Sequence, residues 1–337
     1  MALLISNAIL HTVGNQEHQT RYSDVELDVD SETCIEFVGK HVRRLLRNPA
    51  AKEATFTADS PVYSLVKSFQ RDELRFKDLS RQLCERLTGI MNENEDIVPA
   101  DVLVAFFDSG KQSYLAIVKL NYGECFTHKL TAGDNGETEN QIVKNTAVLP
   151  LSASKVEEAC LIPYDPMILR ILEKPHTVGG EEVNYFSKLF LECETKLSQK
   201  EAAEAIKEIA DEINVKYFDG NVETAATVKT ALIAEAEAAG DGDGLVLENV
   251  VGRSFGDNND AKDEFIALAK EYGLPHQVML DKPFVQREFK HQKYKAENGV
   301  EIKFPAELLQ APEQIQVTTN PDGSLSITFN NLRPAEL

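Results

Sequence analysis

The sequence predicts an α+β fold, with an N-terminal antiparallel sheet and its helices, a helical middle segment and a C-terminal β-hairpin. Apolar runs at 102–107 and 114–120 flank the turn Asp108-Ser109-Gly110-Lys111, a pattern typical of a β-hairpin. Ser198 and Glu201 have the spacing of a capping box and open an acidic helical stretch. Alternating residues on both sides of Pro321-Asp322-Gly323 predict a second hairpin near the end of the chain.

Residues 1–175 contain the elements expected of one N-terminal α+β domain. The helix predictions rest on apolar residues spaced for one helical face, on a stop at Pro49 and on the cap Ser60-Pro61. In chain order, the predicted elements are a strand at 3–10, a helix at 31–47, a helical region from 60 to about 91, the hairpin described above, and two segments that extend the sheet, 125–130 and 146–150.

Residues 176–337 are predicted to form a second domain, helical over 183–275 and then a β-hairpin over 299–330. Gly240 and Gly273 act as helix stops in this region. The helices are expected at 183–193, 198–215, 222–239 and 260–272.

The charge of the chain limits its possible partners. The 337 residues include 35 Lys and Arg against 55 Asp and Glu, a formal net charge of −20. Residues 151–280 alone contain 12 basic and 25 acidic side chains. Such a field repels phosphates, so it argues against DNA wrapped over the whole surface and favours basic protein partners.

The cysteines and the apolar segments point to the cytoplasm. The five cysteines are widely spaced and show no metal-binding pattern, which favours reduced thiols in a reducing compartment. No apolar stretch approaches the roughly 18 residues of a membrane span. We therefore expect a cytoplasmic protein that does not contact membranes.

No motif in the sequence predicts catalysis, a metal or a cofactor. The glycine-rich segment 240–244 follows a helix and precedes a strand-like run, the reverse of a dinucleotide-binding loop, and it lacks EF-hand ligands. The four acidic residues between 257 and 264 could form a carboxylate metal site, but an aspartate cap at the start of the following helix is favoured. We expect a non-catalytic protein.

Two groups of basic residues are candidates for nucleic-acid contact. The first is a stripe on the last turns of the predicted helix 31–47, formed by Lys40, Arg43, Arg44 and Arg47. Cations also stabilise a helix C-terminus, and this structural role is favoured over contact with nucleic acid.

The second group is Lys282, Arg287, Lys290, His291, Lys293 and Lys295. Between residues 281 and 295 there are five Lys or Arg against two acids. Val285, Phe289 and Gln292 could form the inward stripe of a helix, with the cations outward. A solvated basic face and a phosphate-binding surface are equally compatible with this pattern.

Five stretches near the end of the chain form a recognisable series: Tyr294-Lys295, Gly299 to Leu309, Ile315-Gln316-Val317, Asp322 to Ile327 and Asn331-Leu332-Arg333. This series resembles the C-terminus of the bacterial nucleoid-associated protein family of the NdpA/YejK type. Shorter similar stretches are Ala8 to His11, Tyr114 to Val118 and Tyr185 to Leu191. The resemblance covers essentially the whole chain and implies a cytoplasmic protein at the nucleoid, without an assigned catalytic activity.

Three functions are compatible with the sequence. The first is association with chromosomal DNA, directly through the basic segment 282–295 or through basic, DNA-bound proteins. The second is an acidic scaffold that uses residues 183–275 as a docking surface. The third is a metal-dependent nucleic-acid-processing enzyme that uses carboxylates such as Asp241, Asp243 or Asp257. A two-fold homodimer is a further expectation, because paired subunits would double a weak contact.

Overall fold

The computed structural model describes residues 3–15, 19–94, 96–132, 138–151, 153–178, 180–240, 242–320 and 324–331. The chain divides into two compact units, Met1–Lys196 and Leu197–Leu337. The sequence-based boundary lay earlier, after residue 175. Residues 193–195 form a strand that pairs with residues 54–56, and this long-range pairing holds the segment before Lys196 in the first unit.

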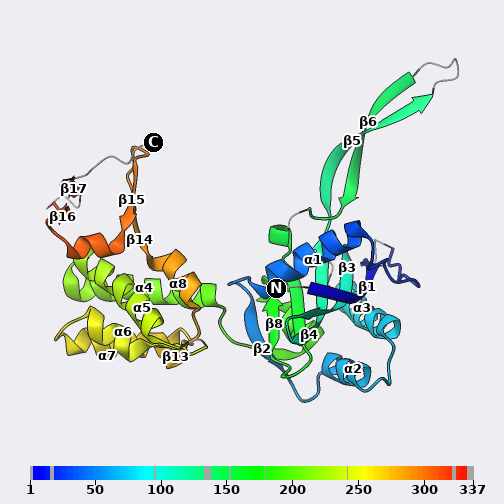
Figure 1. Cartoon of the computed structure of the whole chain (residues 1–337), viewed down its shortest axis with the longest axis horizontal. Helices are drawn as coiled ribbons and strands as arrows, with labels where there is room; N and C mark the ends of the chain where they lie inside the picture. The colour runs from blue at the N-terminus through cyan, green and yellow to red at the C-terminus, as the bar shows by residue number, and fades with distance from the viewer. Residues whose placement is uncertain are drawn as a thin grey trace. The chain divides into compact units, whose positions relative to one another are not determined.

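A seven-stranded antiparallel sheet forms the centre of the first unit (Figure 1). Its strands, in spatial order, are β1 (Leu3–Val13), β3 (Ala100–Ser109), β4 (Gln112–Asn121), β7 (Glu158–Pro163), β8 (Leu169–Leu172), β2 (Lys52–Phe56) and β11 (Cys193–Thr195). The predicted hairpin is β3–β4, in which Ser109 pairs with Gln112. The mixed α+β class with an N-terminal antiparallel sheet is therefore confirmed.

Helices cover both faces of this sheet. Successive residues of a strand point to opposite faces, so one strand contributes side chains to two cores. On β3, Val102 and Val104 belong to the core that includes residues of α2 (Pro61–Gln70) and α3 (Phe76–Glu93). Leu103 belongs to the opposite core, with residues of α1 (Glu32–Leu46). The helical region predicted from residue 60 is thus interrupted between Gln70 and Phe76.

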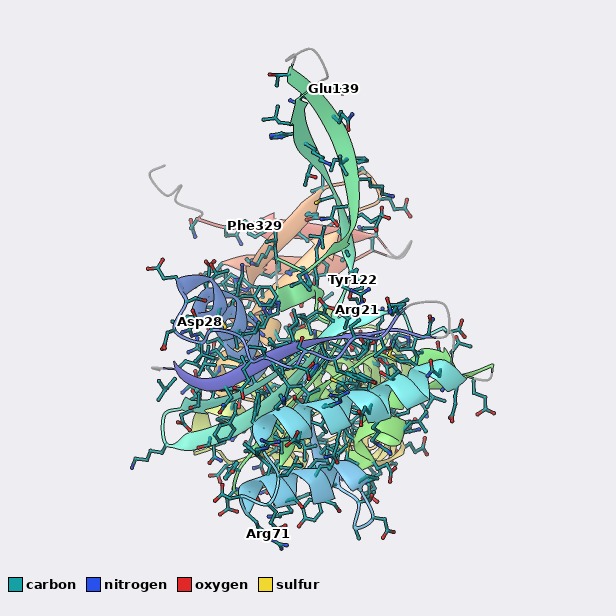
Figure 2. The ribbon with its side chains drawn as sticks, turned by 90° about the vertical axis from the view of Figure 1, so that its right-hand side faces the viewer. Arg21, Asp28, Arg71, Tyr122, Glu139 and Phe329 are labelled. Atoms are coloured by element: carbon teal, nitrogen blue, oxygen red, sulfur yellow. The ribbon has the colours of Figure 1, made fainter. Side chains whose placement is uncertain are left out.

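The segments predicted to extend the sheet instead form a separate two-stranded hairpin. Strands β5 (Gly123–Ala132) and β6 (Thr138–Val148) pair only with each other among the described residues. Tyr122 lies at the base of this arm and Glu139 near its far end (Figure 2). The prediction was wrong because alternation shows that a segment is a strand and does not show which strand it pairs with.

Short elements connect the sheet to the end of the unit. They are η1 (Ala153–Lys155), β9 (His176–Val178), β10 (Glu181–Val183) and η2 (Phe186–Leu191). The helix predicted over 183–193 is only the six-residue π-helix η2. Its C-cap residue Glu192 has φ 49°, and the left-handed conformation ends the helix and leads into β11.

The second unit begins with a bundle of helices. Their bounds are α4 (Gln199–Phe218), α5 (Val222–Ala238), α6 (Leu247–Ser254), α7 (Asn259–Glu271) and α8 (Lys282–Phe289), with the two short strands β12 (Leu245–Val246) and β13 (Gln277–Val278). The predicted capping box is present: the Glu201 amide donates to the Ser198 hydroxyl at 3.1 Å, and the Ser198 amide donates to the Glu201 carboxylate at 2.8 Å.

The acidic residues 257–264 occur at the start of α7, as the capping interpretation required, but the cap itself is Asn258. Its side chain accepts from the Ala261 amide at 3.1 Å. Asp260 lies in the first turn, and Glu264 binds Lys216 at 2.6 Å instead of a metal.

The chain after α8 returns to strands. The elements are β14 (His291–Lys295), β15 (Glu301–Pro305), η3 (Ala306–Gln310), β16 (Ile315–Thr319) and β17 (Leu325–Phe329). The predicted pairing of β16 with β17 is confirmed, while the turn at Pro321-Asp322-Gly323 lies outside the described residues. Phe304, Leu309 and Ile315 form a small core with Ala226 of α5.

Candidate nucleic-acid interface

The basic segment 282–295 folds as two elements instead of one amphipathic helix. Helix α8 ends at Phe289, Lys290 is its C-cap, and β14 begins at His291. Gln292 is therefore a strand residue, although it is buried as the helical interpretation expected. On a strand, alternate residues share a face, so His291, Lys293 and Lys295 lie together.

The outer face of the β14–β15 hairpin brings like charges together. Lys293 pairs in register with Lys303, and both side chains are exposed. Directly opposed like charges destabilise an antiparallel pair. The next pair outward is complementary, since Lys295 binds Glu301 at 3.2 Å. The hairpin thus keeps one pair of like charges on its surface, and neither lysine forms an ion pair with a residue that the structure describes.

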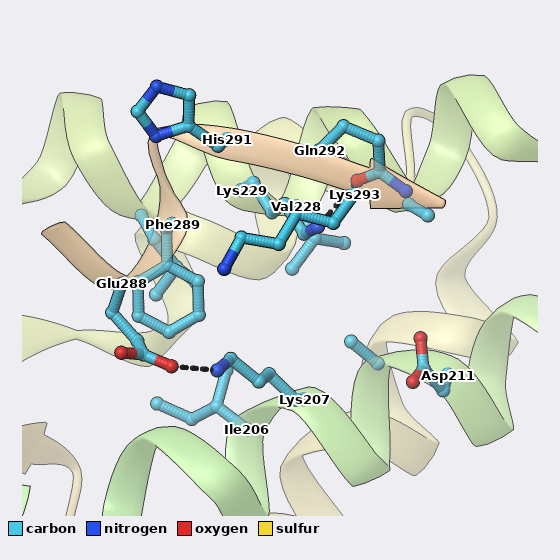
Figure 3. A pocket seen from close by; sticks show the side chains of 13 residues that line it. Ile206, Lys207, Asp211, Val228, Lys229, Glu288, Phe289, His291, Gln292 and Lys293 are labelled. Carbon is cyan, nitrogen blue, oxygen red and sulfur yellow. Dashed lines mark hydrogen bonds and ion pairs between the residues drawn. The ribbon is translucent and has the colours of Figure 1, made fainter. Parts of the chain in front are cut away.

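A pocket of about 340 Å³ lies beside this strand and is enclosed by α4, α5, the end of α8 and β14 (Figure 3). Its apolar lining consists of the buried side chains Ile206, Ala210, Val228, Leu232 and Phe289. Its ionisable lining consists of Lys207, Asp211, Lys229, Glu288, His291 and Lys293.

Lys229 is the least solvated of the pocket lysines. Its ammonium donates to the side-chain oxygen of Gln292, a neutral partner. Burial lowers the pKa of Lys229, and the nearby ammonium groups of Lys207 and Lys293 lower it further, while Asp211 acts in the opposite direction. The site therefore holds concentrated positive charge in a partly dehydrated position.

Two neighbours of Lys229 differ in how their charge is compensated. Lys207 forms an ion pair with Glu288 and lies 5.3 Å from the centre of the Phe289 ring. The hydrogen bond from Lys207 lowers the pKa of Glu288, which keeps that carboxyl ionised. Desolvation lowers the pKa of His291, with further contributions from Lys303, Lys290 and Lys293. These effects favour the uncharged form of the His291 ring at the edge of the pocket.

The remaining predicted residues of this segment lie away from the pocket lining. Lys282 is exposed at the start of α8, and the Arg287 guanidinium lies 5.4 Å from the centre of the Phe284 ring. Lys290 is exposed and close enough to lower the pKa of His291. Of the six predicted residues, His291 and Lys293 line the pocket, Lys290 and Lys295 are exposed beside them, and Lys282 and Arg287 lie on α8 outside the lining.

The other predicted basic stripe belongs to the first unit. Lys40, Arg43 and Arg44 are exposed on α1, and Arg47 is its C-cap. None of the four forms an ion pair with a residue that the structure describes. Their position over the last two turns agrees with the favoured helix-terminus role, and DNA contact by this stripe stays a prediction.

Sequence reasoning missed three members of the site. Lys207 and Lys229 lie on helices that read as acidic, far in sequence from β14, and no local pattern connects them to it. Lys303 could have been found, because pairing Lys295 with Glu301 across the turn places Lys293 opposite Lys303.

The comparison with protein families adds an independent finding. The sequence model of the family described as nucleoid-associated protein YejK matches residues 9–336. The chain belongs to this family. The resemblance of the C-terminal sequence is therefore confirmed, and the family description names association with the nucleoid and no reaction. No curated protein matches the chain.

The carboxylate enzyme hypothesis concerns Asp241, Asp243 and Asp257. Among the described residues, no three His, Cys, Asp or Glu side chains are grouped as a metal site. Asp241, one of the proposed carboxylates, lies outside the described residues.

In the parts of the chain that the structure covers, no helix is long and apolar enough to cross a membrane.

Proposed function

We propose that the protein associates with the nucleoid by contacting DNA phosphates directly through the outer face of the β14–β15 hairpin. The observation that carries this proposal is the cross-strand pair Lys293 and Lys303, whose side chains are exposed and form no ion pair among the described residues. A DNA backbone would supply the missing counter-charge. Lys290 and Lys295 flank the pair and extend the basic surface.

The charge distribution supports a limited contact instead of a wrapped complex. Residues 197–281 contain 7 basic and 18 acidic side chains, whereas residues 282–337 contain 7 of each. The bundle therefore repels DNA, whereas the tail region of the same unit is neutral and presents a local basic surface. With about three phosphate contacts, the logarithm of the binding constant should fall with the logarithm of the salt concentration with a slope of roughly −3.

A salt titration of the purified protein with a fluorescent DNA duplex tests this proposal. We expect weak, sequence-tolerant binding at low salt, lost as salt is raised with that shallow slope. The Lys290→Glu, Lys293→Glu and Lys303→Glu triple variant should abolish binding. A triple variant that retains the affinity and slope of the parent protein would rule out this face.

An acidic adaptor is the second candidate, and α4 favours it. Glu204, Glu208 and Glu212 are exposed at intervals of four residues, so they share one helix face. Desolvation raises the pKa of Tyr272, and the nearby carboxylates of Glu208 and Glu212 raise it further. Such a face suits a basic, DNA-bound protein. In nuclease-treated extract, the parent protein should retain such partners and a Glu208→Lys, Glu212→Lys variant should lose them.

A homodimer is proposed to use the β5–β6 arm. Phe126, Leu130 and Ile142 have exposed fractions of 73%, 61% and 82%. The register places His128 opposite Ile142, so these three apolar side chains lie on one face of the hairpin. An isolated two-stranded hairpin is marginally stable in water, and contact with the same face of a second copy would bury these side chains.

A further inference from the structure

We propose that the pocket between α4, α5 and β14 binds a small phosphate monoester that carries a planar ring, with a nucleoside monophosphate as the simplest example. This inference goes beyond the proposed DNA contact, because it concerns a small free ligand in a partly open pocket and not a duplex on an outer surface. It rests on the convergence of cations, on their incomplete compensation and on the apolar lining.

The cations of the pocket come from three separate elements. Lys207 is on α4, Lys229 on α5 and Lys293 on β14, and all three line the same space (Figure 3). The two carboxylates facing it are Asp211 and Glu288. The formal balance of these five groups is positive in a chain of net charge −20. Helices that are otherwise acidic thus direct two of their few lysines to one position.

Compensation of these cations is uneven. Glu288 is engaged by Lys207, while the hydrogen bond of Lys229 goes to the neutral Gln292. Asp211 lines the pocket and forms no ion pair with Lys229 within the 4.0 Å limit of such a bond. A half-buried ammonium with a neutral partner is costly to hold. A phosphate between Lys229 and Lys293 would give Lys229 a bonded anion in addition to its neutral acceptor Gln292, and it would bring the same negative charge to Lys293.

The apolar lining determines the rest of the ligand. Phe289, Val228 and Leu232 are buried side chains that nevertheless border the pocket. A planar base could pack on them while its phosphate meets the lysines. About 340 Å³ is at the lower end of the range for small-molecule sites, so it fits one small organic molecule and excludes a duplex.

Isothermal titration calorimetry on the full-length protein with AMP, adenosine and inorganic phosphate tests the proposal. We expect AMP to bind at least about tenfold more tightly than either fragment, since each fragment meets only half of the lining. Equal binding of AMP and adenosine would overturn phosphate recognition. Equal binding of AMP and inorganic phosphate would overturn the role of the ring.

Two variants attribute the binding to this pocket. Lys229→Met removes the buried ammonium, and Gln292→Glu keeps it while giving it an internal counter-charge. Both should weaken AMP binding at least about tenfold. Lys270→Met, at an exposed lysine of α7 outside the pocket lining, is the matched control and should bind AMP like the parent protein. Unchanged affinity in a folded Gln292→Glu variant would overturn the proposal even if Lys229→Met unfolds.

The same variants separate this inference from the proposed DNA contact. Lys229→Met should leave DNA affinity within about twofold of the parent, while Lys290→Glu, at an exposed lysine outside the pocket lining, should weaken DNA binding and retain AMP binding. AMP binding without DNA binding would support the pocket and contradict the DNA proposal. DNA binding without AMP binding would support the DNA proposal and contradict the pocket proposal.

Discussion

Lys293 and Lys303 lie directly opposite each other on the outer face of β14–β15, where cross-strand neighbours usually attract. The repulsion between them lowers the stability of a hairpin at the surface of an acidic protein. The pair lowers stability and concentrates positive charge at one exposed position. A role in binding explains it better than a role in the fold.

The pair gives a prediction in which stability and binding change in opposite directions. Lys303→Glu should create an ion pair with Lys293 and raise the free energy of unfolding by about 0.2–1 kcal/mol. It should also weaken DNA binding and reduce the salt slope by about one, as expected for one lost phosphate contact. Urea unfolding and fluorescence anisotropy measure the two effects. Lys270→Glu, with the same charge change on α7, should lower neither the affinity nor the slope comparably.

The basic stripe on α1 should act on stability alone. Replacing Arg44 and Arg47 by Glu places negative charge at the negative end of the helix dipole, which should cost about 0.5–2 kcal/mol in total. DNA affinity should stay within about twofold of the parent protein. A large loss of affinity with little loss of stability would transfer the DNA interface to α1.

The arm should control the oligomeric state. In Phe126→Ser combined with Ile142→Ser, the apolar face of β5–β6 loses two of its three exposed side chains, so the mass in solution should fall from dimer to monomer. Multi-angle light scattering after size exclusion gives this mass directly. Val143 is 38% exposed and lies on the opposite face of β6, so Val143→Ser is the matched control and should leave the mass unchanged. A monomeric parent protein would contradict the proposal.

A buried ion pair in the sheet should be strongly sensitive to the loss of one partner. Lys119 on β4 and Glu158 on β7 lie 3.3 Å apart with no exposed side-chain surface, and His176 also binds Glu158. Burial lowers the pKa of Lys119, while Glu158 opposes that shift. Glu158→Gln leaves the buried ammonium unpaired and should cost about 3–5 kcal/mol in chemical denaturation. The Lys119→Met, Glu158→Gln double variant should lose less than Glu158→Gln alone.

His11 should make the first unit less stable in mild acid. Its Nδ1 accepts from the Ser23 amide at 3.0 Å, which leaves Nε2 to donate to the Ser80 hydroxyl at 3.0 Å. Burial lowers the pKa of His11, with a smaller contribution from Arg81. The unfolded chain therefore binds a proton that the folded chain does not, and stability falls as pH drops below about 6.5 toward the folded pKa.

His11→Gln removes this titration, so its unfolding free energy should depend less on pH between about 7 and 5 than that of the parent. Urea denaturation across this range measures the difference. Equal pH slopes in the two proteins would show that His11 takes up no proton on unfolding.

Local signals in the sequence predicted individual elements better than their pairing. Ser198 with Glu201, Pro49 and Gly273 each specify a helix end through neighbouring backbone groups, and the structure has helix ends at these positions. Strands β2, β7, β8 and β11 are short and join the sheet from distant parts of the chain, so no local spacing reveals their order.

For the candidate site, too, the sequence predicted local features and did not predict which distant residues come together. The tail cations were visible as a cluster in the sequence, but their arrangement depends on where α8 ends, which placed Gln292 on a strand. Lys207 and Lys229 reach the pocket only through the packing of α4 against α5, a tertiary relationship that composition and spacing do not specify.

Among the described residues, two hydrophobic cores belong to Met1–Lys196 and two to Leu197–Leu337. A single melting temperature would therefore combine two processes. The chain has no tryptophan, so one introduced at Tyr164 would report unfolding of the first unit, and one introduced at Tyr272 that of the second. With such reporters, a variant that fails to bind DNA can be distinguished from one whose binding unit has melted.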